Sequence, residues 1–278
     1  MRIALKLLTA AAVLGCLASP TMADWNVGDP HKMHFPQLPD LENGLDVLAM
    51  TPYPFDPLFG KVVADDWLCT RTGPVTDIHI WGSWLNDEFP HDPTGLPDPG
   101  AVTFRLSIHS DIPADPPEYS RPGALLREFV FQPGSFQSQE WGLASEEFFD
   151  PNNLDTPIIG TDTRVIQYNF FFDPIEAFRQ EEGTIYWLDV SATVAAGDQA
   201  VFGWKTSQDH FNDDSVYGDW LPDQPGPDEW FELIDPRTGV SLDQAFVITP
   251  EPGTLVLLAI GTAAGGFVCL LRRRKRRQ

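Results

Sequence analysis

Oxygen-bearing side chains gather in one stretch of the chain: Asp209, Asn212, Asp213, Asp214 and Asp219 fall within eleven positions. Calcium takes about six to eight oxygen ligands, and carboxylates are frequent donors to it. The EF-hand order of acidic residues around a glycine is absent here, so no known loop motif fixes the geometry. Two hypotheses stay open. Either Asp209, Asp213, Asp214 and Asp219 are calcium ligands, or they form an acidic loop that water alone solvates.

Tryptophan is the second residue type that could bind a ligand, and the chain has nine. An outward-facing indole beside carboxylates can stack on a sugar ring, whereas an inward-facing indole is simply part of the core. Trp187 alternates with Tyr186, Leu188 and Val190 and therefore falls on the opposite face of the same segment. Trp187 is thus the best candidate for an exposed ligand-binding residue, with packing between strands as the alternative.

Catalytic signatures give little support for an enzyme. The sequence has no G-x-S-x-G, no H-E-x-x-H, no P-loop and no dinucleotide-binding fingerprint. Glycosidases work with two carboxylates, but acidic residues are so abundant here that no pair stands out. We expect a non-enzymatic protein that needs no cofactor. A carbohydrate-binding module, assisted by calcium, is the first alternative, and an extracellular glycan hydrolase is the second.

The elements that must position these residues have the periodicity of strands. Val102, Phe104, Leu106 and Ile108 alternate with polar residues, which is typical of a sheet with one buried face. Similar patterns or short apolar runs predict about eight strands: 62–69, 75–84, 102–109, 125–131, 166–172, 186–192, 200–204 and 245–249.

Clusters of proline and glycine separate these segments, for example 93–100 and 113–123. Many strands, few helices and 26 prolines predict an all-β fold, a β-sandwich of jelly-roll type. No linker or composition shift divides the interior, so we expect one domain over residues 24–249. This region resembles exported bacterial domains of unknown function that end in a strand like Ala245–Pro250. The resemblance implies architecture and cellular address, and no activity.

Charge excludes one class of partner. The whole chain carries a formal charge of −22. The two termini hold 8 of its 18 basic residues and one of its 40 acidic residues, so the body between them is near −29. Such a surface repels nucleic acids and acidic polysaccharides at low salt, unless divalent cations intervene. We therefore expect no nucleic-acid partner.

Cysteine usage says how the domain is held together. Cys69 is the single cysteine of the body, so disulfides within it do not stabilise the fold. Its apolar neighbours predict a buried structural thiol. A reactive nucleophile or an intermolecular bridge is the alternative.

The N-terminus has the features of a secretory signal peptide. Arg2 and Lys6 precede an apolar run, and Thr21 and Ala23 are the small residues that a signal peptidase recognises. We expect cleavage after Ala23, so that residues 1–23 are removed. An uncleaved N-terminal anchor is the alternative, but the apolar run is short for a membrane span.

The C-terminus has the features of a membrane anchor. Residues 254–271 carry no charge, and as a helix they would extend roughly 27 Å, enough for a thin bilayer. Basic residues collect on cytoplasmic flanks, so the tail 272–278 is expected inside the cell and the domain outside. The signal peptide requires the same single-pass orientation. The cations that stop transfer are Arg272, Arg273, Arg274, Lys275, Arg276 and Arg277.

A stiff tripeptide, Pro250-Glu251-Pro252, stands just before the apolar segment. The order of Pro-Glu-Pro, apolar helix and arginine-rich tail closely resembles the PEP-CTERM sorting signal of Gram-negative bacteria, over residues 250–278. The resemblance implies that Pro250, Glu251 and Pro252 are recognised by an exosortase and that the anchor is then removable. It also implies association with exopolysaccharide and the extracellular matrix.

Together these features predict an exported protein with a non-catalytic β-sandwich ectodomain. Signal peptidase and exosortase are its expected processing enzymes, the membrane holds it through the C-terminal helix, and exopolysaccharide is a candidate partner. It is either retained in the membrane or released to the cell surface or matrix.

Overall fold

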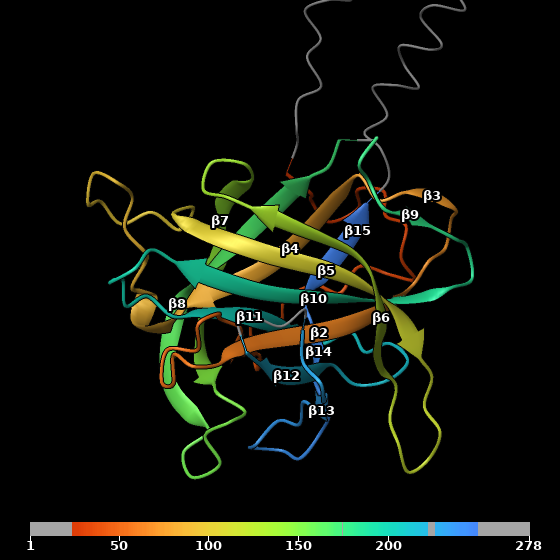
Figure 1. Cartoon of the computed structure of the whole chain (residues 1–278). Coiled ribbons are helices and arrows are strands. Elements are labelled where there is room, and N and C mark those ends of the chain that lie inside the picture. Colours follow the sequence, from red (N-terminus) through yellow and green to blue (C-terminus); the bar gives the residue numbers. More distant parts are fainter. Residues whose placement is uncertain (1–23, 174, 222–225, 250–278) are drawn as a thin grey trace, which may run out of the picture. The chain divides into compact units, whose positions relative to one another are not determined.

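A computed structural model describes residues 24–173, 175–221 and 226–249 (Figure 1). Over these ranges the protein is all-β, as predicted, with one short 3₁₀ turn at Leu85–Asp87. The strands are β1 Leu45–Leu48, β2 Gly60–Leu68, β3 Gly73–Pro74, β4 Asp77–Trp84, β5 Val102–Ile112, β6 Arg121–Phe131, β7 Gln137–Phe149, β8 Ile158–Phe171, β9 Arg179–Gln180, β10 Ile185–Val194, β11 Phe202–Ser207, β12 Val216–Trp220, β13 Phe231–Glu232, β14 Asp243–Gln244 and β15 Phe246–Thr249.

Several predicted features lie outside the described residues. They are the signal peptide 1–23 with Ala23, the tripeptide Pro250–Pro252, the apolar segment 254–271 and the basic tail 272–278. Within the described ranges, no helix is long and apolar enough to cross a bilayer. The described residues from Trp25 onward cluster into one compact unit.

One sheet has six strands in the order β13-β12-β2-β10-β5-β6, and every neighbouring pair is antiparallel. β10 lies at its centre between β2 and β5. The predicted alternation is present: Phe104, Leu106 and Ile108 of β5 share a buried face with Leu188 and Val190 of β10. This face looks toward the second sheet because its residues belong to the common core.

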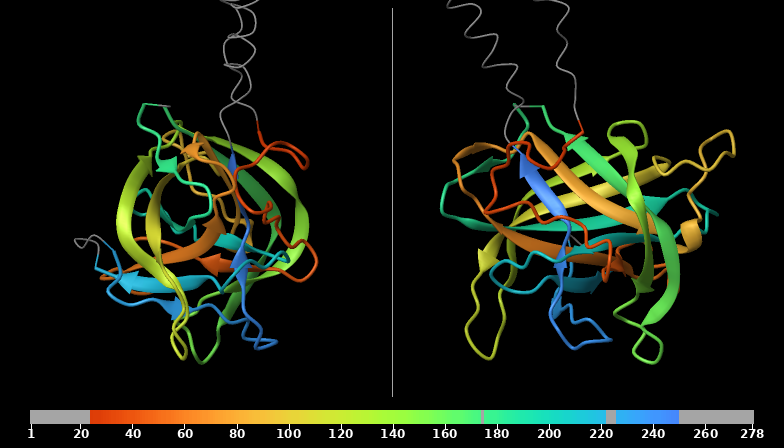
Figure 2. Two further views of the ribbon diagram at one scale, coloured as in Figure 1. Left: turned by 90° about the vertical axis from the view of Figure 1, so that its right-hand side faces the viewer. Right: turned by 180° about the vertical axis from the view of Figure 1, so that it is seen from behind.

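The second sheet closes on itself. Its order is β14-β11-β1-β7-β8-β4-β15, and β11 also pairs with β4. Strands β1, β7, β8, β4 and β11 therefore form a small barrel, in which β1 and β7 are parallel. β4 pairs with β15 over its first half and with β11 over its second half. The right-hand view of Figure 2 shows β15 (blue), β4 (orange) and β8 (green) in that order.

The closed barrel is a feature that the predicted β-sandwich of jelly-roll type did not include. Glycines permit it at the junction between β4 and β11. A Cβ on Gly82 would lie 2.4 Å from the ring of Phe202 and 2.6 Å from the backbone oxygen of Gly203, both on β11. One on Gly203 would lie 2.8 Å from the Cβ of Asp46 on the neighbouring strand β1. Because no side chain stands at these two positions, the strand backbones approach closely enough to complete the barrel.

Aromatic side chains fill the space between the barrel and the six-stranded sheet. Phe104 of β5 packs edge-to-face against Tyr168, Phe170 and Phe202, with ring centroids 4.8, 5.3 and 5.1 Å away. Trp84 Nε1 donates a hydrogen bond to the Tyr168 hydroxyl at 2.8 Å, so its one polar atom is satisfied inside this core.

Cys69 lies in this core and is free of any disulfide. Its Sγ donates to the Arg71 carbonyl oxygen at 3.3 Å, and burial raises the pKa of the thiol. The burial expected from its apolar neighbours is confirmed.

Candidate functional site

The acidic residues singled out in the sequence meet in part on the outer side of the six-stranded sheet. Asp213 and Asp214 precede β12, and β13 pairs with β12 so that Glu232 lies opposite Val216. One carboxylate oxygen from each of Asp213, Asp214 and Glu232 lies within 4.8 Å of the others. We call these three residues the outer cluster; each is half-buried.

Local hydrogen bonds orient the outer cluster. Asp213 Oδ2 accepts from the backbone N–H of Ser120 at 2.7 Å, and Asp213 Oδ1 accepts from the N–H of Asp214 at 3.1 Å. Asn212 adopts a left-handed backbone conformation with φ of 56°, which turns the chain just before the two aspartates. The loop thus presents both carboxylates toward β13.

Electrostatic repulsion acts within the outer cluster. Burial raises the pKa of the Glu232 carboxyl, and the neighbouring charges of Asp214 and Asp213 raise it further. Burial also raises the pKa of Asp214, against a hydrogen bond from Ser241. Carboxylates held close together in this way favour either a proton or a cation between them.

More acidic groups lie behind this cluster. Burial raises the pKa of Asp66 to about 8, although Asn212 Nδ2 donates to Asp66 Oδ2 at 2.6 Å. Burial likewise raises the pKa of Asp243 to about 7. The buried Asp65 has a raised pKa because of its burial and then because of Asp243. This end of the sheet therefore has carboxyl groups both at the surface and beneath it.

The predicted calcium ligands divide between different places. Asp213 and Asp214 join the outer cluster, but Asp219 lies on β12 and pairs with Lys61 Nζ at 2.7 Å. Asp209 is exposed, and its N–H donates to Ser207 Oγ at 3.0 Å. A single site built from Asp209, Asp213, Asp214 and Asp219 is therefore wrong.

Glu232 is the member of the outer cluster that sequence reasoning missed. It reaches the site through the pairing of two short strands, and a two-residue strand leaves no periodic signal. Its carboxylate and those of Asp213 and Asp214 are hard oxygen donors of the kind that calcium prefers, and water would have to complete the coordination.

Trp187 requires a correction. It faces away from the main core as its alternation predicts, yet its side chain is fully buried. Ala64 and Val216 pack with it, and Tyr119 and Trp230 cover them from outside. Trp187 Nε1 donates to Asp111 Oδ1 at 2.9 Å. The prediction of an exposed ligand-binding face at Trp187 is wrong because a second layer of loop residues covers this part of the sheet.

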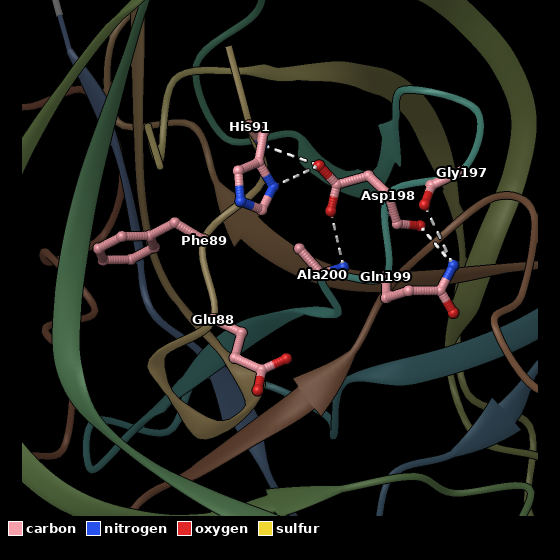
Figure 3. A pocket seen from close by; sticks show the side chains of 7 residues that line it. All are labelled: Glu88, Phe89, His91, Gly197, Asp198, Gln199 and Ala200. Carbon is pink, nitrogen blue, oxygen red and sulfur yellow. Dashed lines mark hydrogen bonds and ion pairs between the residues drawn. The ribbon is translucent and has the colours of Figure 1, made fainter. Parts of the chain in front are cut away.

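A shallow pocket lies at another edge of the domain (Figure 3). Its volume is about 180 Å³, which is below the roughly 300 Å³ at which ligand pockets begin. Asp198 Oδ2 accepts from the backbone N–H of His91 at 2.8 Å, and His91 Nδ1 lies 3.2 Å from the same oxygen. The other residues lining it are Glu88, Phe89, Gly197, Gln199 and Ala200.

The hydrogen bonds in this pocket have a structural role. Asp198 Oδ1 accepts from the N–H of Ala200 at 3.0 Å, so both oxygens of the carboxylate have partners. Burial disfavours the charged Asp198, but its hydrogen bonds to Ala200 and His91 outweigh this and lower its pKa. The pair thus closes a loop junction, and Glu88 points away from it in Figure 3.

Comparisons with known families assign two parts of the chain. Residues 33–249 match a family described as a domain of unknown function, DUF7901. Residues 249–276 match the PEP-CTERM protein-sorting motif. No curated protein matches the chain.

A solved structure titled "AvmM Catalyzes Macrocyclization in Alchivemycin A Biosynthesis" matches at 12% identity, over 75% of this chain and 85% of that one. Its TM-score is 0.24, and a likeness this weak carries no argument about fold or activity.

Proposed function

The chain belongs to the DUF7901 family and ends in a PEP-CTERM sorting motif, and from this premise we propose that it is a non-catalytic protein of the cell surface or extracellular matrix. The motif makes it an exosortase substrate with an extracytoplasmic, surface-exposed domain. The proposal adds that the β-domain acts by adhesion or as matrix structure, with exopolysaccharide as its partner.

The position of the sorting motif carries the proposal. The motif begins at residue 249, and β15, the last strand, ends at Thr249. β15 pairs with β4 from Phe246 to Thr249, opposite Ile80 to Asp77. Cleavage just beyond this strand would leave every described strand in place, so an intact domain would be released.

The remaining steps of the proposed route concern the two ends of the chain. Signal peptidase removes residues 1–23 after Ala23, and residues 254–271 hold the exported chain in the membrane as a single helix. The tail 272–278 stays inside through its six cations. Exosortase then recognises Pro250, Glu251 and Pro252 and separates the domain from this anchor.

The tripeptide can be tested directly. Pro250→Ala, Glu251→Ala and Pro252→Ala together should leave the chain with its tail uncleaved, as read by intact mass of protein from the cell envelope. The matched control is Leu154→Ala with Ile175→Ala, because these side chains are 88% and 89% exposed and far from the motif in sequence. Unchanged processing of the triple variant would refute recognition through this tripeptide.

The outer cluster supports one second candidate function, calcium-assisted carbohydrate binding. A body with a charge near −29 can approach an acidic polysaccharide through a divalent cation, and Asp213, Asp214 and Glu232 offer three oxygens within reach of one ion. A glycan array run with calcium and with chelator tests this candidate. Binding that is absent, or indifferent to chelator, would count against it.

A further inference from the structure

The barrel interior has an unusual polar composition. Each of its five strands contributes one polar residue to the same place: Asp46 from β1, Ser83 from β4, Glu146 from β7, Asp162 from β8 and Lys205 from β11. All five are between 0% and 3% exposed. Asp46 and Lys205 are direct partners across β1 and β11, and Glu146 and Asp162 are partners across β7 and β8.

In the barrel interior, the amine of Lys205 contacts two carboxyl groups. Lys205 Nζ lies 2.7 Å from Asp46 Oδ2 and also contacts Glu146 Oε2. Asp162 lies beside Asp46, with one carboxylate oxygen from each of Asp46, Glu146 and Asp162 within 4.8 Å of the others. We call Asp46, Glu146, Asp162 and Lys205 the barrel cluster.

Burial disfavours the charged forms of these groups. It lowers the pKa of the Lys205 amine, against the opposing effect of Asp46. It raises the pKa of the Asp162 carboxyl to about 10, and the nearby charge of Asp46 raises it further. Glu146 Oε1 is buried without a hydrogen-bond partner among the described residues. Converting the ions of such a buried cluster into neutral groups is therefore favourable.

We propose that Lys205 and Asp46 condense into an intramolecular amide, with Glu146 carrying the proton. The barrel would then be closed covalently between β1 and β11. This inference concerns the domain itself and does not depend on how the C-terminus is processed.

The reaction balances without an oxidant, a reductant or a cofactor. A proton moves from Lys205 Nζ to the Asp46 carboxyl across their hydrogen bond, and the neutral amine attacks Asp46 Cγ. Glu146 takes the proton from the attacking nitrogen and returns it to the departing hydroxyl. A C–N bond forms, a C–O bond breaks and one water leaves.

The fold supplies what such a condensation needs. Amine and carboxyl are held in contact, and effective molarities of about 10⁵–10⁸ M are reached when groups are oriented in this way. Asp162, with its proton retained, stands beside Asp46 and can donate to the oxygen on which negative charge develops. Release of the product water from the sealed barrel interior favours the amide over the separate amine and carboxyl groups.

Peptide mass spectrometry of the full-length protein tests the proposal. Trypsin would free residues 33–61, which contain Asp46, by cutting at Lys32 and Lys61. It does not cut after an acylated lysine, so residues 180–237 should stay whole and be joined to 33–61. The branched product should weigh about 18 Da, one water, less than the two peptides together.

Three variants keep the result decisive. Lys205→Arg keeps a cation and should abolish the branch. Glu146→Gln removes the proton carrier with little change of shape and should leave residues 33–61 and 180–205 as free peptides. Glu147→Gln is the matched control, because this neighbour is 43% exposed and pairs with Arg237; its branch should persist.

Two outcomes would overturn the proposal. The first is free, full-mass peptides 33–61 and 180–205 from the wild-type protein, which would leave the barrel cluster as an uncondensed ion pair. The second is a branch from Lys205 onto residues 128–164, which contain Glu146 and Asp162, because the acyl donor would then be one of these two residues and not Asp46.

Discussion

The barrel cluster and the outer cluster both bring three carboxylates within 4.8 Å of one another, yet their surroundings differ. The barrel cluster is sealed and contains the side-chain nitrogen of Lys205. The outer cluster is half-buried and is repelled by its own charges. The difference shows how position decides chemistry: the sealed acids face an internal amine, whereas the outer acids remain within reach of an ion from solvent.

The largest expected effect comes from removing the buried Lys205 of the barrel cluster. Lys205→Met should lower the free energy of unfolding by about 3–5 kcal/mol, because it leaves two buried carboxylates without their partner. The variant also cannot form the proposed amide, and closing a loop between residues 159 apart is worth about 5 kcal/mol by the entropic estimate for cross-links. Denaturant titration of the purified protein measures the change.

Lys61→Met is the matched control for this prediction. Lys61 is also fully buried, but its partner Asp219 is 35% exposed and regains water when the lysine is removed. The loss of unfolding free energy should therefore be smaller for Lys61→Met than for Lys205→Met. An equal loss for the two variants would mean that the sealed interior gives Lys205 no special role.

The next effect is a pH dependence that originates in the barrel cluster. The pKa of Asp162 is about 10 in the folded protein, whereas it is near 3.9 in an unfolded chain. A raised carboxyl pKa contributes stability that is complete below about pH 4 and is lost as pH rises toward 10. The free energy of unfolding should therefore fall by up to about 1.4 kcal/mol per pH unit for this one group.

Asp162→Asn isolates the contribution of this carboxyl. The amide mimics the protonated acid, so the variant should lose the part of the slope due to Asp162 between pH 7 and pH 9. Well above the usual histidine pKa of about 6.5, the half-buried His34 and the buried His79, with pKa values lowered to about 3 and 4, are neutral in both states and do not interfere. Thermal melts across this range should show the flatter profile, and an unaltered slope would place the pH dependence elsewhere.

The smallest expected effect belongs to the outer cluster. If it binds calcium with a Kd of about 10⁻⁴–10⁻³ M, as extracellular sites do, 1 mM calcium should stabilise the domain by about 0.4–1.4 kcal/mol. Asp213→Asn with Glu232→Gln should abolish this shift. Asp209→Asn should not, because Asp209 lies outside the cluster. A shift that survives in the double variant would assign calcium to other residues.

Local patterns in the sequence predicted much of the fold. The alternation around Phe104 became β5, and all eight predicted segments contain strands of the structure. β7 was missed because its sequence, Gln137–Phe149, is largely polar and bulged, with one face toward solvent. β1 was missed because four residues are too few for a periodic signal.

Long-range contacts could not be predicted in the same way. The closure between β4 and β11 depends on close approach at Gly82 and Gly203, which no period reveals. Trp187 shows the same limit for the site: alternation gave its face correctly, but the cover from Tyr119 and Trp230 comes from distant loops. Lys205 and Asp46 meet for the same reason, across 159 positions of sequence.

Whether an exosortase processes this surface protein can be measured from the intact mass of the protein recovered from its native envelope. We expect a chain that begins at Asp24 and ends near residue 250, just after the end of β15. A mass that still includes residues 254–278 would contradict it, and the protein would then be a permanently anchored membrane protein.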